Sequence, residues 1–266
     1  MNEFLNVNRV AFTIGGYEIY WYGVIICAAI LVAILIASFY AKEKGYPGDI
    51  AINIALVILP AGILCARLFA VLFDSSLSIS DYFNFRSGGM SIIGAVVGGG
   101  IALTIYCLVK KEKEPFKYFD TLAVVLILAQ AIGRWGNYFN EEVYGQVIEA
   151  GSAFAKFPFA VLIDGTYYQA LFFYEFCLNL LVFIFLSDIY LRVKNTGYVT
   201  ALYLVFYGTI RAFLEPLRQT EFILKLNGIA ISQVLSITMI AVGILLFAVR
   251  YILNNKKKVK KNEQEN

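Results

Sequence analysis

The sequence predicts an all-α polytopic membrane protein: seven transmembrane helices, with a small external subdomain between the fourth and the fifth. Three observations lead to this class. Hydrophobic residues make up 60% of the 266 residues and charged residues only 15%, whereas about a quarter of a soluble domain is charged. The mean hydropathy is +0.71. The apolar residues also gather into seven runs, each near the ~20 residues that a helix needs to cross a bilayer.

The runs follow one another with short gaps, which indicates a single integral membrane domain over residues 1–266. Backbone polar groups inside hydrocarbon must be satisfied within their own segment, so each run is predicted to be a helix. The predicted spans are residues 19–40, 50–73, 90–109, 118–137, 169–190, 198–215 and 229–251. The longest connection, residues 138–168, is predicted to form the small external subdomain.

Lysine and arginine set the expected orientation, because they are enriched in cytoplasmic loops. One set of alternate connections holds Lys42, Lys44, Lys110, Lys111, Lys113, Lys117, Arg192, Lys194, Arg250 and the lysines of the tail 252–266. The other set holds fewer: Arg9, Arg86, Lys156, Arg218 and Lys225. We therefore expect a multi-pass membrane protein, with the N-terminus outside and a cytoplasmic basic tail. Nothing elsewhere in the chain indicates nucleic-acid binding.

The chain contains no histidine. Histidine is the commonest metal ligand and the commonest general base, so its absence makes a metal site or a histidine-based mechanism unexpected. The four cysteines lie inside apolar runs, where they are expected to be small buried residues. We expect no metal ion and no organic cofactor.

A cluster of polar residues ends the fourth apolar run, in the stretch AIGRWGNYFNEEVYG at 131–145. Arg134 and Asn137 are three residues apart and therefore share a helix face, and Glu142 follows. A single arginine at a helix end is explained by its side chain reaching for the head groups. An arginine, two asparagines and two glutamates together fit that explanation poorly, so we predict a functional site here.

A second polar cluster lies in the sixth run, where Tyr207, Arg211 and Glu215 recur every four residues along one side of the helix. An Arg–Glu pair within the helix, keeping two charges neutral overall, is the simpler explanation. Glu175, in the fifth run, needs a partner, and Arg134 or Arg211 is expected to supply it. Arg67, in the second run, fits a structural role equally well.

The stretch SGGMSIIGAVVGGG at 87–100 is rich in glycine, but no Walker lysine follows it. Gly94 and Gly98 form a GxxxG pattern, which favours close packing of two helices. Gly88 and Gly89 lie just before the span and are predicted to let the backbone approach a ligand.

Two arginines at membrane depth, beside amides and carboxylates, suit an anionic phospholipid head group. Arginine binds phosphate through two parallel hydrogen bonds, and the surrounding spans can accept acyl chains. This reasoning leaves an enzyme, a lipid transporter and a lipid-binding protein open. A transporter commonly has inverted repeats and a site near the midplane, whereas these polar residues lie toward one face.

Several stretches resemble bacterial prolipoprotein diacylglyceryl transferases. The segment GRWGNYFNEEVYG matches that family's pattern G-R-x-G-N-[FY]-x-N-x-E-x-x-G. The segments IYWYG, CARLFAVLF, YGTIRAFLEPLR and ISQVLS resemble other family stretches in the same order, so the likeness covers nearly the whole chain. Enzymes of this family transfer a diacylglyceryl group from phosphatidylglycerol to the lipobox cysteine of a preprolipoprotein, yielding a thioether and glycerol phosphate.

The resemblance implies that this chain has the same transferase activity. It also implies three partners: phosphatidylglycerol, a lipobox segment of a preprolipoprotein, and the lipid bilayer. It favours Glu142 over Glu141 as the functional acid. The residues expected to carry catalysis are Arg134, Arg211, Tyr22, Glu142 and Glu215. Those expected to bind substrate are Asn137, Asn140, Gly145, Tyr207, Gly88, Gly89 and Glu175.

Two departures stand out. The family commonly has H-G-G where this chain has Ile93-Gly94-Ala95, and H-P-T-x-L-Y-E where it has QALFFYE at 169–175. A mechanism that requires the first of these histidines as a base cannot operate here. The sequence thus leaves a divergent active enzyme, which we favour, and an inactive paralogue that binds anionic phospholipid or lipoprotein precursors.

Overall fold

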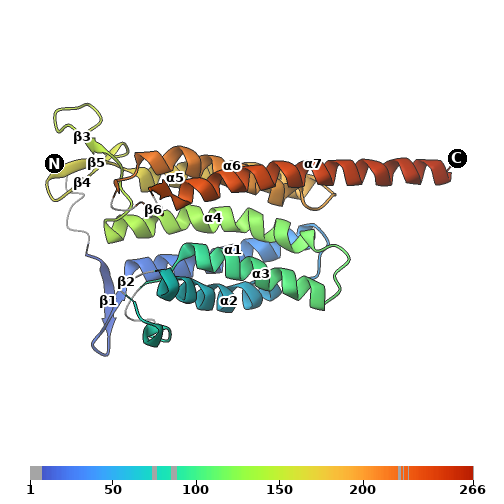
Figure 1. Ribbon diagram of the computed structural model, residues 1–266, viewed down its shortest axis with the longest axis horizontal. Coiled ribbons are helices and arrows are strands. Elements are labelled where there is room, and N and C mark those ends of the chain that lie inside the picture. Colours follow the sequence, from blue (N-terminus) through green and yellow to red (C-terminus); the bar gives the residue numbers. More distant parts are fainter. Residues whose placement is uncertain are drawn as a thin grey trace. The chain divides into compact units, whose positions relative to one another are not determined.

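The computed structural model describes residues 8–73, 77–84, 89–220, 223, 225–226 and 228–265 (Figure 1). One helix overlaps each predicted span. The helices are α1 Trp21–Glu43, α2 Ile50–Phe73, α3 Ile92–Val109, α4 Phe116–Asn140, α5 Leu171–Arg192, α6 Tyr198–Leu214 and α7 Ile231–Glu265. The helical class is therefore confirmed.

Six helices in the described part of the chain are long and apolar enough to cross a membrane. The remaining one, α6, has 17 residues, which is short of the ~20 that a perpendicular crossing needs. A 3-10 turn, η3 (Glu215–Leu217), follows α6 and contains Pro216. The α-helix ends before this residue because proline cannot continue it. The count of seven spans stays a prediction.

The all-α description is incomplete, because three small antiparallel sheets accompany the helices. Strands β1 (Val10–Ile14) and β2 (Tyr17–Tyr20) form a hairpin. Strands β3 (Val147–Ile148), β4 (Ala160–Ile163) and β5 (Thr166–Gln169) form a sheet in the order β3-β5-β4, and β6 (Lys225–Leu226) pairs with β7 (Ile229–Ala230). Their turns carry hairpin sequences: Gly15-Gly16 and Asp164-Gly165 all have positive φ.

The last helix is longer than the predicted span. The fold continues α7 to Glu265, so residues 252–265 of the predicted tail are helical, and their place in the cytoplasm stays a prediction. Lysine and glutamate are good helix formers, which is why a charged stretch can extend an apolar span.

The chain falls into two compact units, Met1–Ile36 with Ala123–Asn266, and Ala37–Leu122. The prediction of one domain over 1–266 stays a prediction. In the second unit, Gly94 and Gly98 of α3 face Cys65 of α2, and a Cβ on either glycine would clash with that residue. The GxxxG interpretation of close helix packing is thus confirmed. Arg67, fully buried, donates to the carbonyls of Asn84 and Gly89 at 2.8 Å each, which is a structural role.

In the first unit, α5, α6 and α7 run side by side (Figure 1). The β3-β5-β4 sheet lies where α4 ends and α5 begins (Figure 1). An apolar cluster joins sheet and helices there: Val161 and Phe172 are buried, and Trp135, Tyr138 and Ile163 pack against them. This cluster fixes the ends of α4 and α5, from which the predicted site residues project.

Candidate functional site

The two predicted polar clusters form one network, and Glu175 joins them. Nη2 of Arg134 on α4 lies 2.6 Å from Oε1 of Glu175. Nη1 of Arg211 on α6 lies 3.2 Å from Oε2 of the same carboxylate. The sequence predicted that one of these arginines would be its partner, and Glu175 binds both. Glu175 is 3% exposed, so both ion pairs lie inside the helix bundle. The contact with Arg211 is also a hydrogen bond, whereas Oε1 pairs with Arg134 by charge and accepts no hydrogen bond among the described residues.

The network continues beyond Arg211. Its Nη2 lies 2.5 Å from Oε2 of Glu215, and Nη1 of Arg218 lies 3.0 Å from the same oxygen. The hydroxyl of Ser232, near the start of α7, donates to the other oxygen of Glu215. The Arg–Glu pair expected within α6 is therefore present, but it is one link in a larger network rather than the whole explanation.

Glu142 lies at the other end of the network. Nη1 of Arg134 donates to Oδ1 of Asn137 at 3.1 Å, and Nδ2 of Asn137 donates to Oε1 of Glu142 at 2.8 Å. Nδ2 of Asn140 donates to the same oxygen at 3.3 Å. Asn137 therefore stands between Arg134 and Glu142 within the described residues. The functional role of Glu142 stays a prediction.

Tyr22 reaches the network by packing against a glycine. A Cβ on Gly136 would lie 2.7 Å from Cδ2 of the Tyr22 ring, so only glycine lets the ring approach α4 this closely. The Tyr22 side chain lies within electrostatic range of Glu142 and Arg134. Tyr207 on α6 lies close enough to Arg134 and Arg211 to interact with them electrostatically, and its ring stacks on Tyr203 with centroids 5.7 Å apart.

Gly145 has a packing role that the sequence did not predict. Its N–H donates to the carbonyl of Gln169 at 2.9 Å, and its carbonyl accepts from Nε2 of Gln219 at 2.9 Å. A Cβ here would lie 2.8 Å from Cβ of Gln169. This glycine ties the loop after α4 to the segment after α6, so it keeps Glu142 and Arg218 in one region. Its contact with substrate stays a prediction.

Of the two glycines predicted just before the third span, Gly89 lies in the other unit. Gly89 has φ of +71° and its carbonyl accepts from Arg67, which gives it a structural reason to be glycine. Gly88 lies outside the described residues.

Sequence reasoning missed three residues. Arg218 was counted as a basic residue of an outer connection and lies in the family-like stretch YGTIRAFLEPLR, but it was given no role, although its spacing of three from Glu215 was a usable signal. Its buried Nε has no hydrogen-bond partner among the described residues. Burial lowers the pKa of Arg218, and the Glu215 carboxylate offsets part of that effect.

The other two residues that sequence reasoning missed are Ser232 and Asn179. No pattern in the sequence indicated that Ser232 belongs to the site. Asn179, one turn beyond Glu175, is fully buried, and its amide has no partner in the described part of the chain.

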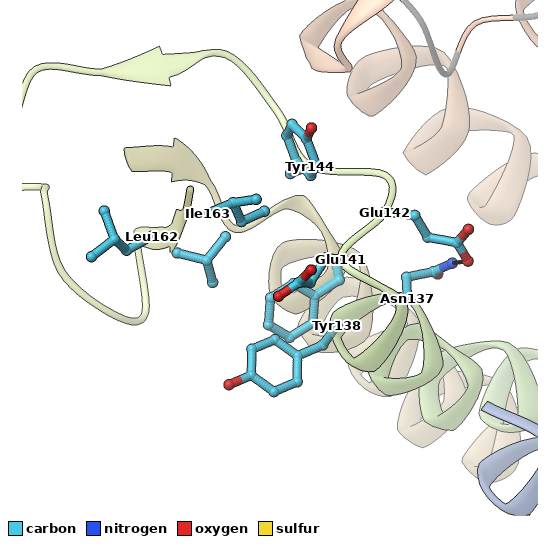
Figure 2. Close-up of a pocket in the computed structure, with 9 residues that line it drawn as sticks. Asn137, Tyr138, Glu141, Glu142, Tyr144, Leu162 and Ile163 are labelled. Atoms are coloured by element: carbon cyan, nitrogen blue, oxygen red, sulfur yellow. Dashed lines mark hydrogen bonds between the residues drawn. The ribbon is translucent and has the colours of Figure 1, made fainter. Parts of the chain in front are cut away.

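A pocket adjoins the Glu142 end of the network (Figure 2). Val161, Leu162 and Ile163 of β4 form one side with Phe172, and the end of α4 forms the other with Asn137 and Tyr138. Glu141 and Glu142 also line it, and Tyr144 completes it. Within the described residues, no group of three or more histidine, cysteine, aspartate or glutamate side chains is arranged to hold a metal ion.

The network has the chemistry of an anion site. Three arginines supply donors in a fixed geometry, and carboxylates of the same region hold them in place. A phosphate group can replace solvent at the remaining guanidinium donors, since each guanidinium has five. Such a site can bind a phosphorylated head group and stabilise negative charge that develops on a departing phosphate.

Comparisons with known proteins point the same way. Residues 9–249 match the model of the family described as prolipoprotein diacylglyceryl transferase. A phosphatidylglycerol–prolipoprotein diacylglyceryl transferase of Clostridium perfringens is 36% identical over 96% of this chain and 98% of its own. A protein of the same name from Clostridium botulinum is 37% identical over 96% of this chain and 100% of its own. One from Clostridioides difficile is 35% identical over 90% and 94%.

Proposed function

The chain belongs to the prolipoprotein diacylglyceryl transferase family, and we propose that it transfers a diacylglyceryl group from phosphatidylglycerol to the lipobox cysteine of preprolipoproteins. It is a multi-pass membrane protein, as its family and its long apolar helices indicate. The curated relatives carry the names of both substrates, and the anion-binding chemistry of the arginine network suits the first of them.

The proposed reaction is a displacement at the glycerol carbon that carries the phosphate. The sulfur of the acceptor cysteine forms a bond to that carbon as the carbon–oxygen bond to phosphate breaks. The products are a thioether and glycerol phosphate, and the thiol proton leaves to a base or to solvent. Negative charge builds up on the departing phosphate, so donors fixed around it lower the barrier.

One observation carries the assignment of residues to these steps. Glu175 binds Arg134 and Arg211 with its two oxygens, at 2.6 and 3.2 Å. The two guanidinium groups are thereby preorganised, since the carboxylate fixes their positions before any substrate arrives. We propose that Arg134 and Arg211 bind the phosphate, with Tyr207 beside them. Glu175 and Glu215 position the arginines.

The absence of histidine does not prevent this reaction. A free thiol has a pKa near ~8.5, so a few per cent is thiolate at neutral pH, and neighbouring arginines raise that fraction. Glu142, held by Asn137 and Asn140, and Tyr22 are the proposed proton acceptors where one is needed. At the positions where the family commonly has histidine, this chain has Ile93 and Gln169. The latter accepts a backbone hydrogen bond from Gln146 at 3.3 Å.

We place the site at the outer face of the bacterial cell membrane, with the N-terminus outside and the C-terminus in the cytoplasm. The distribution of lysine and arginine supports this orientation. In it, residues 138–168 lie outside, where a preprolipoprotein emerges from the membrane. The alternative function is that of an inactive paralogue that binds phospholipid or lipoprotein precursors, and the names of the curated relatives favour the transferase.

The test is a transfer assay with purified protein, phosphatidylglycerol and a peptide that carries a lipobox cysteine. We expect the peptide to gain the mass of a diacylglyceryl group and glycerol phosphate to be released in equal amount. A peptide with serine in place of the cysteine is the control, because a hydroxyl is a far weaker nucleophile at neutral pH.

The Ile93→His variant, assayed beside the unmodified protein, separates the alternatives. We expect the protein to be active without this substitution. A silent protein that the histidine rescues would mean that a dedicated base is required. If both are silent while phosphatidylglycerol still binds, the noncatalytic alternative holds.

A further inference from the structure

The pocket between β4 and the end of α4 has an apolar wall and an acidic edge (Figure 2). Val161 is 7% exposed and Phe172 3%, so the wall is part of the packed core that joins sheet and helices. Glu141 and Glu142 come from the loop that follows α4. A wall of medium-sized apolar side chains fits small apolar groups of a ligand.

The charges at the pocket argue against a second phospholipid head group. Glu141 pairs with the exposed Arg9 at 3.1 Å. Glu142 receives hydrogen bonds from two uncharged amides of the described chain, so its negative charge is not neutralised by them. A phosphate bound here would face a carboxylate of like charge, whereas a neutral or cationic polypeptide would not.

The pocket shares two residues with the polar network of the proposed site. Asn137 and Glu142 line the pocket, and the same Asn137 contacts Arg134. A ligand held against β4 therefore lies next to Asn137 and Glu142, and Asn137 is in direct contact with Arg134. That is where a cysteine must lie in order to attack a phospholipid held by Arg134 and Arg211.

We propose that this pocket binds the polypeptide substrate, taking up an apolar side chain next to the acceptor cysteine. The inference rests on the proposed function and adds the subsite that determines peptide specificity. Ile163 contributes to the wall, and Glu142 lies beside the cysteine that the bound peptide presents. Phosphatidylglycerol occupies the arginine network and not this pocket.

The test is the Ile163→Trp variant, which fills the pocket without adding charge. The peptide substrates form pairs that differ at one position, with leucine in one peptide and alanine in the other. The varied position is each of the three residues before and the three residues after the cysteine, and KM is compared within each pair. At one position, Ile163→Trp should raise KM for the leucine peptide by about tenfold or more relative to the alanine peptide, since leucine has three more carbon atoms than alanine and even one methylene in an apolar pocket is worth about that much. The KM for phosphatidylglycerol should not change. Ile163→Ala should shift the preference toward leucine or larger residues.

Val147→Trp is the matched control, because Val147 belongs to the same sheet, is exposed and does not line the pocket. It should leave both KM values unchanged. The proposal is overturned if Ile163→Trp changes no peptide KM, if it changes KM for all peptides equally, or if it raises KM for phosphatidylglycerol instead. The last result would make the pocket a lipid site.

A direct binding measurement keeps this test separate from the proposed function. A fluorescent lipobox peptide is titrated into the detergent-solubilised protein without phosphatidylglycerol. Tighter binding to the unmodified protein than to Ile163→Trp supports the pocket even if no transfer occurs, in which case only the proposed function fails. Equal binding to the unmodified protein, Ile163→Trp and Val147→Trp rejects the pocket, whether or not transfer occurs.

Discussion

Arg134 and Glu175 form an ion pair of 2.6 Å between Nη2 and Oε1, although one residue stands near the end of α4 and the other in the second turn of α5. The other oxygen of Glu175 binds Arg211. One buried carboxylate therefore separates two arginines that would otherwise repel each other in a region of low dielectric constant. The predictions begin with this carboxylate.

Replacing Glu175 by glutamine keeps the shape and removes the charge. Two arginines would then share a region without their common counter-charge, and breaking a buried pair costs about 3–5 kcal/mol. We expect Glu175→Gln to abolish most transfer and to lower the unfolding temperature in detergent. Asp188→Asn is the matched control, because Asp188 is an exposed carboxylate that pairs with Arg192 at the other end of α5. Equal behaviour of the two variants would contradict the central role of Glu175.

Replacing either central arginine by lysine keeps the charge and removes the planar fork. Because lysine cannot form two parallel hydrogen bonds to phosphate, Arg134→Lys and Arg211→Lys should each lower kcat by about 10²-fold or more. Both proteins should still insert in the membrane. Arg9→Lys, on the exposed surface, should be nearly neutral. Near-normal turnover of the two lysine variants at Arg134 and Arg211 would rule out the phosphate-binding role.

Substitutions at two glycines of α4, Gly133 and Gly136, test whether the position of the Tyr22 ring matters for transfer. A Cβ on Gly136 would lie 2.7 Å from the Tyr22 ring, whereas a Cβ on Gly133 would meet Ile26 at an ordinary 3.4 Å. Gly136→Ala should therefore displace Tyr22 and slow transfer, and Gly133→Ala should not. Measured kcat and KM of the two variants decide this. Tyr22→Phe should slow transfer less than Arg134→Ala does, because the ring's position is kept and only the hydroxyl is lost.

The buried side-chain amide of Asn179 should lower the free energy of unfolding of the protein. Neither of its side-chain atoms has a partner within the described chain, and an unsatisfied buried polar group costs about 1–3 kcal/mol. Asn179→Leu, of similar size, is expected to raise the unfolding temperature. Ser187→Ala is the control, because that hydroxyl is also buried and unpartnered in the described residues, and it should give a smaller gain. A destabilised Asn179→Leu protein would show that the amide has a partner when the protein is in a bilayer.

The orientation is tested by reporters. A reporter fused after Lys261 should be active in the cytoplasm, and one inserted near Glu149 should be active outside. The asymmetry of basic residues between alternate connections is the reason. A C-terminal reporter found outside would place the arginine network at the cytoplasmic face, where the proposed substrate peptide does not emerge.

The sequence by itself determined the helices and their approximate ends. Apolar runs of spanning length leave the backbone one way to satisfy its hydrogen bonds, so α2 was predicted at the residues it occupies, 50–73. The sequence also supplied the chemistry, because Arg134, Arg211 and Glu175 are costly in apolar runs and hence stand out. The extension of α7 and the small sheets were missed. The charged end of α7 lacks an apolar pattern, and the hairpins are too short for alternation to be read clearly.

Only the tertiary structure decided which side chains meet. Glu175 had two possible partners in the sequence and binds both, because α4 and α6 bring their arginines to opposite oxygens of one carboxylate. Asn137 comes between Arg134 and Glu142, and Arg218 joins through Glu215. Spacing along one helix fixes which residues share a face. Contacts between helices depend on how large side chains such as Trp135 and Phe172 pack, with ring centroids 5.6 Å apart, and that packing is set by the whole fold.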